Sequence, residues 1–315
     1  MNDPIPQDVT IKPAFAERYK DLLGDSYDEY IKYSLSYAHK AIRVNTLKST
    51  PEEIQDRLSN DWELTPVPWI KEGFFIHYKH GKRFDIGNLE EHQLGYFYVQ
   101  DPASMIPPLV LDPKPGDFVL DLCSAPGSKT TQLAAMMENK GLLLAHDVDI
   151  SRVKPLGLNL NRCGVHNTAV IVRANSKLPQ EYFDKVLVDA PCSGTGTIRR
   201  SLKTLLMWSP NLVKKLSRLQ RQLVLQGYDA LKPGGVLVYS TCTQEPEENE
   251  AIVSWLIQKT GARMEDIELN INRSDAITAF NGEEYHPDVK KCLRIYPQDN
   301  DTEGFFVAKI RKPSQ

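Results

Sequence analysis

Two cysteines occupy positions from which a thiol could do chemistry. Cys192 lies in DAPCSGTG (189–196) and Cys242 lies in YSTCT (239–243), each just past an apolar, strand-like run. Asp189 stands three residues before Cys192. A thiolate is a strong nucleophile once its surroundings lower its pKa. A thiol and a carboxyl group in this order suit addition of sulfur to an electron-poor ring carbon, while the acid shares a proton with a ring nitrogen.

Two other interpretations of these cysteines stay open. A free cysteine is most often a small buried hydrophobe, and we expect that role for Cys163 and Cys292 and close packing for Cys123. In the sequence, neither Cys192 nor Cys242 has a histidine nearby. A Cys-His hydrolase is still compatible with the sequence, because catalytic groups assemble in space rather than along the chain.

A second candidate site is the turn DLCSAPGSKT (121–130), which joins an apolar run to a helix-like run. A turn of small residues lets backbone N–H groups approach a ligand beside a helix N-terminus. Its spacing fits neither a P-loop nor a G-x-G-x-x-G dinucleotide site. Asp147 ends the next apolar run, where an acid can accept hydrogen bonds from ribose hydroxyls. The pattern favours an adenosine ligand without phosphates, with a purely structural turn as the alternative.

Residues 199–221 form a strongly basic stretch in a chain whose net charge is −3. The stretch has no acidic residue, and its seven cations are Arg199, Arg200, Lys203, Lys214, Lys215, Arg218 and Arg221. Further cations in the N-terminal region are Arg43, Lys48, Lys79, Lys82 and Arg83. A local positive face suits a phosphate backbone, and a solvated helix face is the alternative. The acidic segment EPEENE (245–250) is explained by helix capping and compensation of the helix dipole.

The elements that must position these residues follow an alternating pattern from residue 113 onwards. The strand-like runs are 118–122, 141–147, 168–175, 185–190, 235–242 and 305–310. Helix-like runs separate them, including a long one with leucines at 212, 216, 219 and 223. Continuous Val/Leu/Ile runs separated by helices predict an α/β fold, a doubly wound and mostly parallel sheet covered on both faces. Ligands bind at the carboxyl ends of such strands, where the candidate residues lie. The strands before Cys192 and Cys242 are consecutive in the sequence, so we expect them to be neighbours in the sheet and the two thiols to face one cleft.

The N-terminal region has a different pattern. Residues 14–38 carry apolar side chains at steps of three and four, which predicts an amphipathic helix broken near Gly24. Residues 41–46 alternate like a strand, and Ser49-Thr50-Pro51-Glu52-Glu53 is typical of a helix start. Short extended pieces follow at 62–69 and 73–80. We therefore predict a small α+β module over residues 1–95 and a second domain over residues 96–315.

Composition limits the class of protein. The 315 residues are 41% hydrophobic and 25% charged, as in an ordinary globular chain. No apolar run approaches the ~18 residues of a membrane span, and the first residues do not have the pattern of a secretory signal. Five cysteines without a CxxC pair argue against a disulfide framework or a zinc site. We expect a reducing, cytoplasmic location, no membrane association and no metal.

Taken together, the motifs resemble those of the Sun-type family of RNA (cytosine-5) methyltransferases. The segments that carry the resemblance are AIRVNTLK, YVQDPASMIPP, DLCSAPGSKT, DAPCSGTGTIRR, LKPGGVLVYSTCTQEPEENE and RIYPQDNDTEGFFVAKI, in this order over residues 41–310. The resemblance implies a Rossmann-like methyltransferase domain, an N-terminal RNA-binding module and S-adenosyl-L-methionine as cofactor. The cofactor-binding positions that it implies are Cys123, Ser124, Ala125, Pro126, Gly127, Ser128, Lys129, Asp147, Arg152, Asn175 and Asp189. The family pattern has an acid where this chain has Asn175.

The resemblance also implies catalytic roles. Cys242 adds to carbon 6 of cytosine, Asp189 supports the ring at N3, and carbon 5 then takes the methyl group. Cys192 assists loss of the carbon 5 proton and release of the adduct, and Lys129 neutralises or orients groups in the site. DNA cytosine methyltransferases instead use the Pro-Cys cysteine, here Cys192, as the nucleophile. Sequence spacing does not separate the two assignments, although the S-T-C-T match favours the RNA family.

The expected substrate is a cytosine in tRNA, with ribosomal RNA as the alternative. Chemistry at carbon 5 requires that the base leave its stack or be unpaired already. We see no appended C-terminal RNA-binding domain in the sequence and take a monomer as the default. Two other hypotheses are a methyltransferase-fold protein that acts on a small molecule or a protein, and a non-catalytic RNA-binding or assembly factor.

Overall fold

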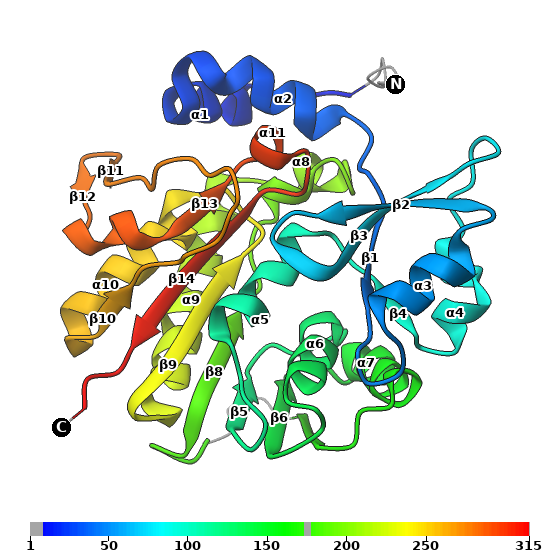
Figure 1. Cartoon of the computed structure of the whole chain (residues 1–315). Coiled ribbons are helices and arrows are strands. Elements are labelled where there is room, and N and C mark those ends of the chain that lie inside the picture. The colour runs from blue at the N-terminus through cyan, green and yellow to red at the C-terminus, as the bar shows by residue number, and fades with distance from the viewer. Residues whose placement is uncertain (1–8, 173–177, 315) are drawn as a thin grey trace. The chain divides into compact units, whose positions relative to one another are not determined.

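The computed structural model describes residues 9–172 and 178–314 (Figure 1). The chain forms two compact units, each built from several stretches of sequence. The first unit takes in the chain up to Ala38, Ala190–Leu225 and Tyr239–Ile310. The second unit takes in His39–Asp189, Gln226–Val238 and the chain from Arg311 onwards. Within the described residues, the helices are too short or too polar to span a bilayer.

A parallel sheet runs through the second unit. Strand β5 (Phe118–Asp121) pairs in parallel with β6 (Leu142–Asp147) on one side and with β8 (Phe183–Asp189) on the other. Strand β7 (Thr168–Val172) pairs in parallel with β6. The interiors of β5, β6 and β8 are buried, as expected for runs of Val, Leu and Ile that are covered on both faces, whereas β7 at the edge of the sheet is partly exposed. These four strands confirm the strands expected from the apolar runs.

The complete sheet has the strand order β10-β14-β9-β8-β5-β6-β7. Strand β10 is Arg263–Glu265, β14 is Phe305–Arg311 and β9 is Leu231–Thr241. A further strand, β13 (Leu293–Ile295), pairs with β14 in antiparallel orientation. Strands β8 and β9, which precede the two cysteine motifs, are hydrogen-bonded neighbours. The predicted class, a doubly wound and mostly parallel α/β sheet, is confirmed.

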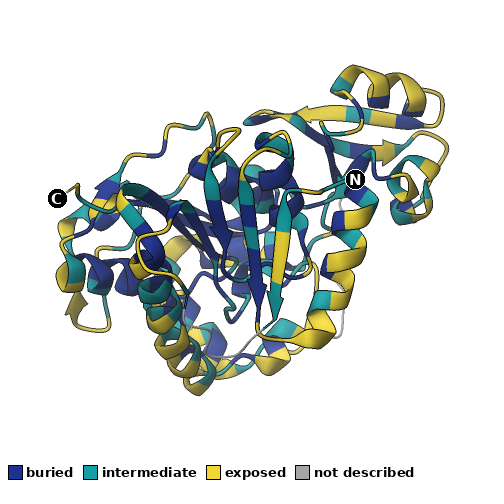
Figure 2. Cartoon of the chain, turned by 90° about the horizontal axis from the view of Figure 1, so that it is seen from below, coloured by how far each residue is buried: buried dark blue, intermediate teal, exposed yellow. Residues whose placement is uncertain are grey.

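Helices of the second unit cover this sheet. Helices α6 (Ser128–Met136) and α7 (Ile150–Cys163) lie beside β6, and α5 (Ile106–Leu111) packs on β8 (Figure 1). The α7 face formed by Leu156, Leu160 and Cys163 is buried. The strands of the sheet show much dark blue and teal in Figure 2, whereas the outer helix faces are mostly yellow. Each helix thus gives one stripe to the core and leaves the opposite stripe to solvent.

An antiparallel sheet with the order β2-β3-β1-β4 also belongs to the second unit. Its strands are β1 (Ala41–Val44), β2 (Trp62–Val67), β3 (Ile70–Tyr78) and β4 (Phe97–Val99). The extended pieces expected from the sequence are confirmed.

Helix α3 (Pro51–Leu58) follows β1 and begins where the sequence predicts. Thr50 accepts the backbone N–H of Glu53, and the Glu53 carboxylate accepts the N–H of Thr50, which completes a capping box. Ile54 and Leu58 of this helix pack in one cluster with Ile42, Trp62, Phe74 and other buried residues of the sheet. The shorter elements nearby are η2 (Ile86–Asn88), α4 (Glu90–Gln93) and η3 (Ala103–Met105).

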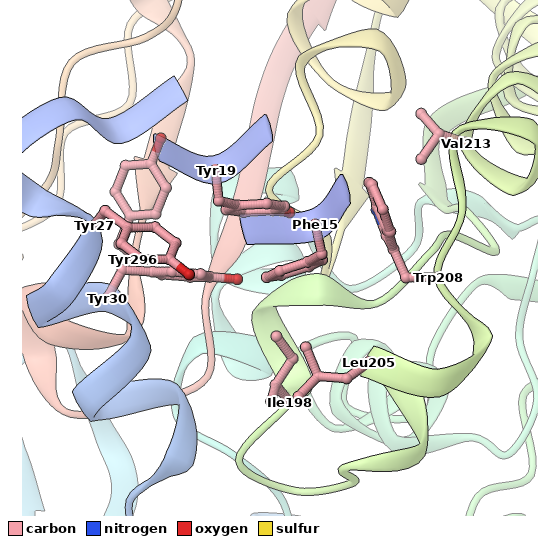
Figure 3. Close-up of a cluster of buried hydrophobic side chains, with 9 residues drawn as sticks. All are labelled: Phe15, Tyr19, Tyr27, Tyr30, Ile198, Leu205, Trp208, Val213 and Tyr296. Atoms are coloured by element: carbon pink, nitrogen blue, oxygen red, sulfur yellow. The ribbon is translucent and has the colours of Figure 1, made fainter. Parts of the chain in front are cut away.

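The first unit begins with two helices, α1 (Pro13–Leu23) and α2 (Tyr27–Leu35), joined by the turn η1 (Gly24–Ser26). Gly24 has a φ of +53°, which few other residues adopt without strain, so the predicted break in the helix is confirmed. Figure 3 shows the aromatic cluster that these helices bury. In it Phe15 stacks on Tyr19 at 4.2 Å between ring centroids, and Tyr19 stacks on Tyr30 at 5.1 Å.

The rest of the first unit follows β8 and β9 along the chain. Its elements are η4 (Thr195–Thr197), α8 (Lys203–Met207), η5 (Pro246–Glu248), α10 (Glu250–Thr260), β11 (Ala279–Phe280), β12 (Glu283–Glu284), η6 (Pro287–Lys291) and α11 (Pro297–Asn300). The long helix α9 (Pro210–Ala230) begins in the first unit and ends in the second. It contains the four leucines whose spacing predicted it.

Candidate active site

The turn after β5 depends on a glycine at its last position. Gly127 caps α6 with a φ of +104°, and a Cβ built there would lie 2.8 Å from the Cδ1 atom of Leu156. A larger residue would therefore be strained in its backbone and would push against α7. The preceding bond, between Ala125 and Pro126, is cis. Small residues thus let the turn lie close to α7.

Asp147 and Arg152 hold this turn from the next strand and helix. Asp147 is buried, and its Oδ2 atom accepts the backbone N–H of Ala125 at 3.1 Å. The Nη2 atom of Arg152 donates to the Ala125 carbonyl at 2.6 Å, and its Nη1 atom lies 3.8 Å from Asp147 Oδ2. The structure therefore brings the predicted turn, acid and arginine together in the second unit. Asn175 lies outside the described residues.

Asp121 supplies a second buried carboxyl group at the start of the turn. Its Oδ2 atom accepts a hydrogen bond from Thr130 Oγ1 at 2.8 Å, whereas Oδ1 has no hydrogen-bond partner among the described residues. Burial raises the pKa of Asp121 to about 7. An orphaned acceptor at this position is a site for a donor group from a ligand.

Lys129 forms an ion pair with Asp189. Its Nζ atom lies 2.7 Å from Asp189 Oδ2 and donates to Ser104 Oγ at 3.0 Å. The lysine side chain is 9% exposed and the aspartate side chain 26% exposed, so the pair is largely removed from water. A charge-assisted hydrogen bond in such surroundings fixes both groups in one geometry. The sequence placed Lys129 and Asp189 in one site, and the structure brings them into contact.

Arg43 supports the same region from β1, which the sequence analysis did not predict. We grouped it with cations that suit a phosphate backbone, but the structure contradicts this because Arg43 is only 2% exposed. Its guanidinium donates to the Ser128 carbonyl at 2.7 Å, to Thr131 Oγ1 at 2.9 Å and to the side chain of Gln100. Gln100 in turn donates to the Ser104 carbonyl at 3.1 Å. Arg43 therefore holds the start of α6 and the segment that carries Ser104.

Cys192 and Cys242 lie together in the first unit. Their sulfur atoms are 3.3 Å apart, a distance at which one thiol can donate to the other sulfur. This hydrogen bond, and then burial, raises the pKa of Cys192 well above the ordinary value. Both residues are partly exposed, whereas Cys163 and Cys292 are buried as expected. The prediction that the two strand ends bring these thiols together is confirmed.

Glu248 holds the loop of Cys192 and was missed by the sequence analysis. It is fully buried, and its Oε2 atom accepts the backbone N–H of Ser193 at 3.1 Å and the side-chain N–H of Gln220 at 2.7 Å. Burial raises the pKa of Glu248 to about 7. Ser193, which follows Cys192, also shares a 2.7 Å hydrogen bond with Thr243, which follows Cys242. The two cysteine loops are therefore tied to each other and to one buried acid.

Two other acids of the EPEENE segment are buried as well. Glu245 accepts hydrogen bonds from Arg18 at 2.7 Å and from Trp208 Nε1 at 2.7 Å. Glu250 forms a bidentate ion pair with Arg294 in which both side chains have no exposed surface. Capping and dipole compensation therefore do not explain this segment. Its acids instead connect α1, the chain before α9, and β13 within the first unit.

The basic stretch divides into buried and exposed cations. The Arg199 side chain is 1% exposed and donates to the Thr302 carbonyl at 3.1 Å and to Asp301 at 2.8 Å, so the structure contradicts a place for it on a phosphate-binding face. Arg221 is partly buried and lies over the ring of Trp255. The five exposed cations are Arg200, Lys203, Lys214, Lys215 and Arg218. Of the seven cations that we expected on a positive face, only these five therefore remain candidates for it.

Comparison with known proteins identifies the family. The sequence model described as "16S rRNA methyltransferase RsmB/F" matches residues 108–311, and the model described as "N-terminal domain of 16S rRNA methyltransferase RsmF" matches residues 11–102. The chain belongs to the RsmB/F family. This family consists of S-adenosylmethionine-dependent RNA (cytosine-5) methyltransferases, in agreement with the predicted resemblance.

Individual members of the RsmB/F family are similar in sequence to this chain over most of its length. The tRNA (cytosine(49)-C(5))-methyltransferase of Pyrococcus abyssi is 46% identical over 96% of this chain and 97% of its own length. The ribosomal RNA small subunit methyltransferase F of Photobacterium profundum is 40% identical over 96% of this chain, and that of Aliivibrio fischeri is 43% identical over 92%. The chain spans 64% and 61% of the length of these two relatives.

Solved structures agree on the fold of the RsmB/F chain. A methyltransferase homologue from Pyrococcus horikoshii is 37% identical, covers 96% of both chains and superposes with a TM-score of 0.85. NSun6 from Pyrococcus horikoshii, crystallised with SFG, covers 98% of this chain and 99% of its own with a TM-score of 0.80. At 24% identity this second likeness shows the fold alone.

The Ser104 contact predicts a kinetic defect. Ser104→Ala removes one acceptor from the nearly buried ammonium of Lys129, and a hydrogen bond to a charged group contributes about 1.5–3 kcal/mol. We expect the kcat for methyl transfer to RNA to fall tenfold or more while the Kd for S-adenosylmethionine stays within about twofold. Ser104→Thr should restore most of the rate because it keeps the hydroxyl, and the exposed Ser201→Ala serves as the control. Wild-type kcat in Ser104→Ala would contradict a positioning role.

The buried Glu248 predicts a dependence of stability on pH. Its pKa is raised from 4.5 to about 7 in the folded chain, so folding takes up a proton between these values. The free energy of unfolding therefore falls as pH rises from about 4.5 through about 7, by about 1.4 kcal/mol per pKa unit. Glu248→Gln does not ionise and should escape this loss.

The measurement is urea unfolding of wild type and Glu248→Gln at several pH values from 4.5 to 8. We expect the free energy of unfolding of the variant minus that of the wild type to increase by about 3 kcal/mol across this range. Groups common to both proteins cancel in the difference. The exposed Glu284→Gln is the control and should give a flat difference. A flat difference for Glu248→Gln would show that its carboxyl ionises normally.

Proposed function

We propose that this member of the RsmB/F family methylates carbon 5 of a cytosine in tRNA. The observation that carries the assignment of the site is the pair of sulfur atoms of Cys192 and Cys242, 3.3 Å apart. Two thiols in contact suit a reaction in which one sulfur forms a covalent bond and the other assists its release. Identity of 46% to the Pyrococcus abyssi enzyme supports tRNA as the substrate and cytosine 49 as the first position to test.

The turn after β5 fits the cofactor expected for the family. S-Adenosylmethionine supplies the methyl group when it is bound. The residues that would hold it are Cys123–Lys129, Asp147, Arg152, Asn175 and Asp189. The buried, unpartnered Oδ1 atom of Asp121 leaves an acceptor for a ligand donor. Val148 is 60% exposed and Ile150 is 64% exposed beside Asp147, an apolar surface that suits an adenine ring.

The hydrogen bond between the thiols supports Cys242 as the nucleophile. Either thiol can donate in this hydrogen bond, and the raised pKa of Cys192 is compatible with an S–H that donates to the sulfur of Cys242. A thiolate at Cys242 then adds to carbon 6 of cytosine, and the electron pair of the 5,6 bond becomes available at carbon 5. After carbon 5 is methylated, its proton passes to a base, either water or Cys192 once its thiol is deprotonated. The electron pair of that C–H bond re-forms the 5,6 bond, and the thiolate of Cys242 leaves. Cys192 assists this last step.

Asp189 and Lys129 have supporting roles in this proposal. Asp189 interacts with the cytosine ring at N3, where negative charge develops when sulfur adds to carbon 6. Lys129 is bonded to Asp189 and Ser104, so it fixes the orientation of the carboxylate and adds a positive charge to the site. Both groups act as preorganised electrostatic partners in largely dry surroundings.

Exposed cations support binding of an RNA backbone. On α9 the cations Lys214, Lys215 and Arg218 are exposed, while Val213 and Gln220 are buried, so the three cations share the outer face. We further propose that residues 1–95 form an RNA-binding module ahead of a catalytic domain over residues 96–315. The protein acts as a cytoplasmic monomer in this proposal.

Nucleoside mass spectrometry tests the proposed reaction and substrate. Purified protein is incubated with S-adenosylmethionine and either unmodified tRNA or 16S ribosomal RNA. We expect new 5-methylcytidine in tRNA, lost when cytosine 49 is replaced by uridine. Methylation of ribosomal RNA alone would overturn the choice of substrate, and methylation of neither RNA would overturn the proposed function.

The two cysteines are expected to give opposite results when replaced. Cys242→Ala should abolish transfer because no nucleophile remains, with cofactor binding retained. Cys192→Ala should accumulate a protein–RNA adduct that survives a denaturing gel, because release is slowed. The double variant is the control and should form no adduct. An adduct in Cys242→Ala, together with its absence in Cys192→Ala, would move the nucleophile to Cys192.

A further inference from the structure

Helix α8 presents large apolar side chains to solvent. Leu206 is 66% exposed, Met207 is 70% exposed, and Leu202 just before the helix is 39% exposed. This five-residue helix follows the cysteine loop 192–198 within the first unit. Single exposed apolar residues are ordinary on protein surfaces, but two consecutive ones on so short an element form a small apolar patch. We call Leu206 and Met207, with Leu202, the α8 patch.

Buried side chains and hydrogen bonds of α8 hold the patch in place. Leu205 and Trp208, which flank the exposed pair in the sequence, are buried in the aromatic cluster with Phe15 and Ile198 (Figure 3). Lys12 Nζ donates to the backbone carbonyls of Leu206 at 2.6 Å and Trp208 at 2.9 Å. The helix end is therefore fixed by packing and by hydrogen bonds. A fixed apolar patch loses little conformational entropy when it meets a partner.

Two exposed cations lie next to the patch in the sequence. Arg200 and Lys203 are exposed, and no acidic residue occurs from 199 to 228 in the sequence. The Glu303 carboxylate lies 3.7 Å from Arg200, and the arginine side chain remains 74% exposed. Apolar side chains bordered by cations match a nucleotide, which offers an apolar base face beside an anionic phosphate. The same cations would repel a basic protein.

We propose that the α8 patch is a nucleotide-binding subsite for the substrate RNA. In it Leu206 and Met207 contact the face of an unpaired base, and Arg200 and Lys203 contact the phosphates beside that base. Leucine and methionine are among the side chains that insert against unstacked bases in nucleic-acid complexes. The subsite rests on the proposed function, since an enzyme that acts on carbon 5 needs its target strand opened. It lies outside the set of residues assigned to catalysis or to the cofactor.

Salt titration of RNA binding separates the two halves of this subsite. The ligands are an unmodified tRNA transcript and, in parallel, a 16S ribosomal RNA transcript. Each phosphate contact adds about 0.7–0.9 to the slope of log K against log salt concentration. Arg200→Ala/Lys203→Ala should lower the slope by between about 1 and 2. Leu206→Ser/Met207→Ser should weaken binding about tenfold at every salt concentration and leave the slope unchanged.

The control is Leu158→Ser, because Leu158 is 72% exposed on α7 and matches the patch in side chain and exposure. It should bind RNA as the wild type does. All three variants replace side chains that are exposed to solvent, so their circular dichroism spectra and melting temperatures should match those of the wild type. The kcat/KM for methyl transfer should fall with affinity in Leu206→Ser/Met207→Ser, while single-turnover kcat at saturating RNA changes less.

Three outcomes would overturn the subsite. The first is wild-type affinity in Leu206→Ser/Met207→Ser, and the second is a wild-type protein that binds neither RNA. The third is a loss of self-association in this variant by sedimentation with RNA affinity retained, which would make the patch a protein contact. A wild type that binds RNA without methylating it would contradict the proposed function alone, and the comparison of affinities would still decide the subsite.

Discussion

The hydrogen bond from the backbone of Ser193 to the buried carboxyl group of Glu248 is the contact on which the thiol site depends. It fixes the residue after Cys192, and the Ser193–Thr243 hydrogen bond then fixes the residue after Cys242. Burial of a carboxyl group costs folding free energy unless the group is neutral or accepts hydrogen bonds. Glu248 meets this requirement with two donors on one oxygen and a pKa near 7. The geometry of the thiols is therefore maintained at the expense of local stability, as is common where a site is preorganised.

The second unit places its acids by a different constraint, the parallel sheet. Asp121, Asp147 and Asp189 are the last residues of β5, β6 and β8, so the direction of the strands alone brings three carboxyl groups to one edge. Each one is then given different surroundings. Asp121 is buried beside Thr130, Asp147 accepts backbone N–H groups of the turn and of Asp149, and Asp189 is paired with Lys129. One type of side chain at one edge of the sheet thus has three different sets of partners.

Much of the fold and of the candidate site could be predicted because their signals are local. The apolar runs, the helix break at Gly24 and the helix start at Thr50 and Pro51 depend on neighbours within a few residues, and the structure has each of them in the expected place. The contact between Cys192 and Cys242 followed from two consecutive strands. The role of Arg43 did not follow, since its partners lie 57 to 88 residues away along the chain. The same reason explains why the EPEENE acids were assigned to capping: in sequence they precede a helix, and only the fold shows Arg18, Gln220 and Arg294 beside them.

The basic stretch shows that a run of cations in a sequence does not tell which of them are exposed in the fold. Arg199 and Arg200 are adjacent and chemically identical, yet the Arg199 side chain is 1% exposed and the Arg200 side chain 74% exposed. A guanidinium that already bonds to Asp301 and to backbone carbonyls has few donors left for a phosphate. The counterion release that drives RNA binding requires cations that stay free in solution. Five cations of the stretch are exposed and meet this requirement, although the net charge of the chain is −3.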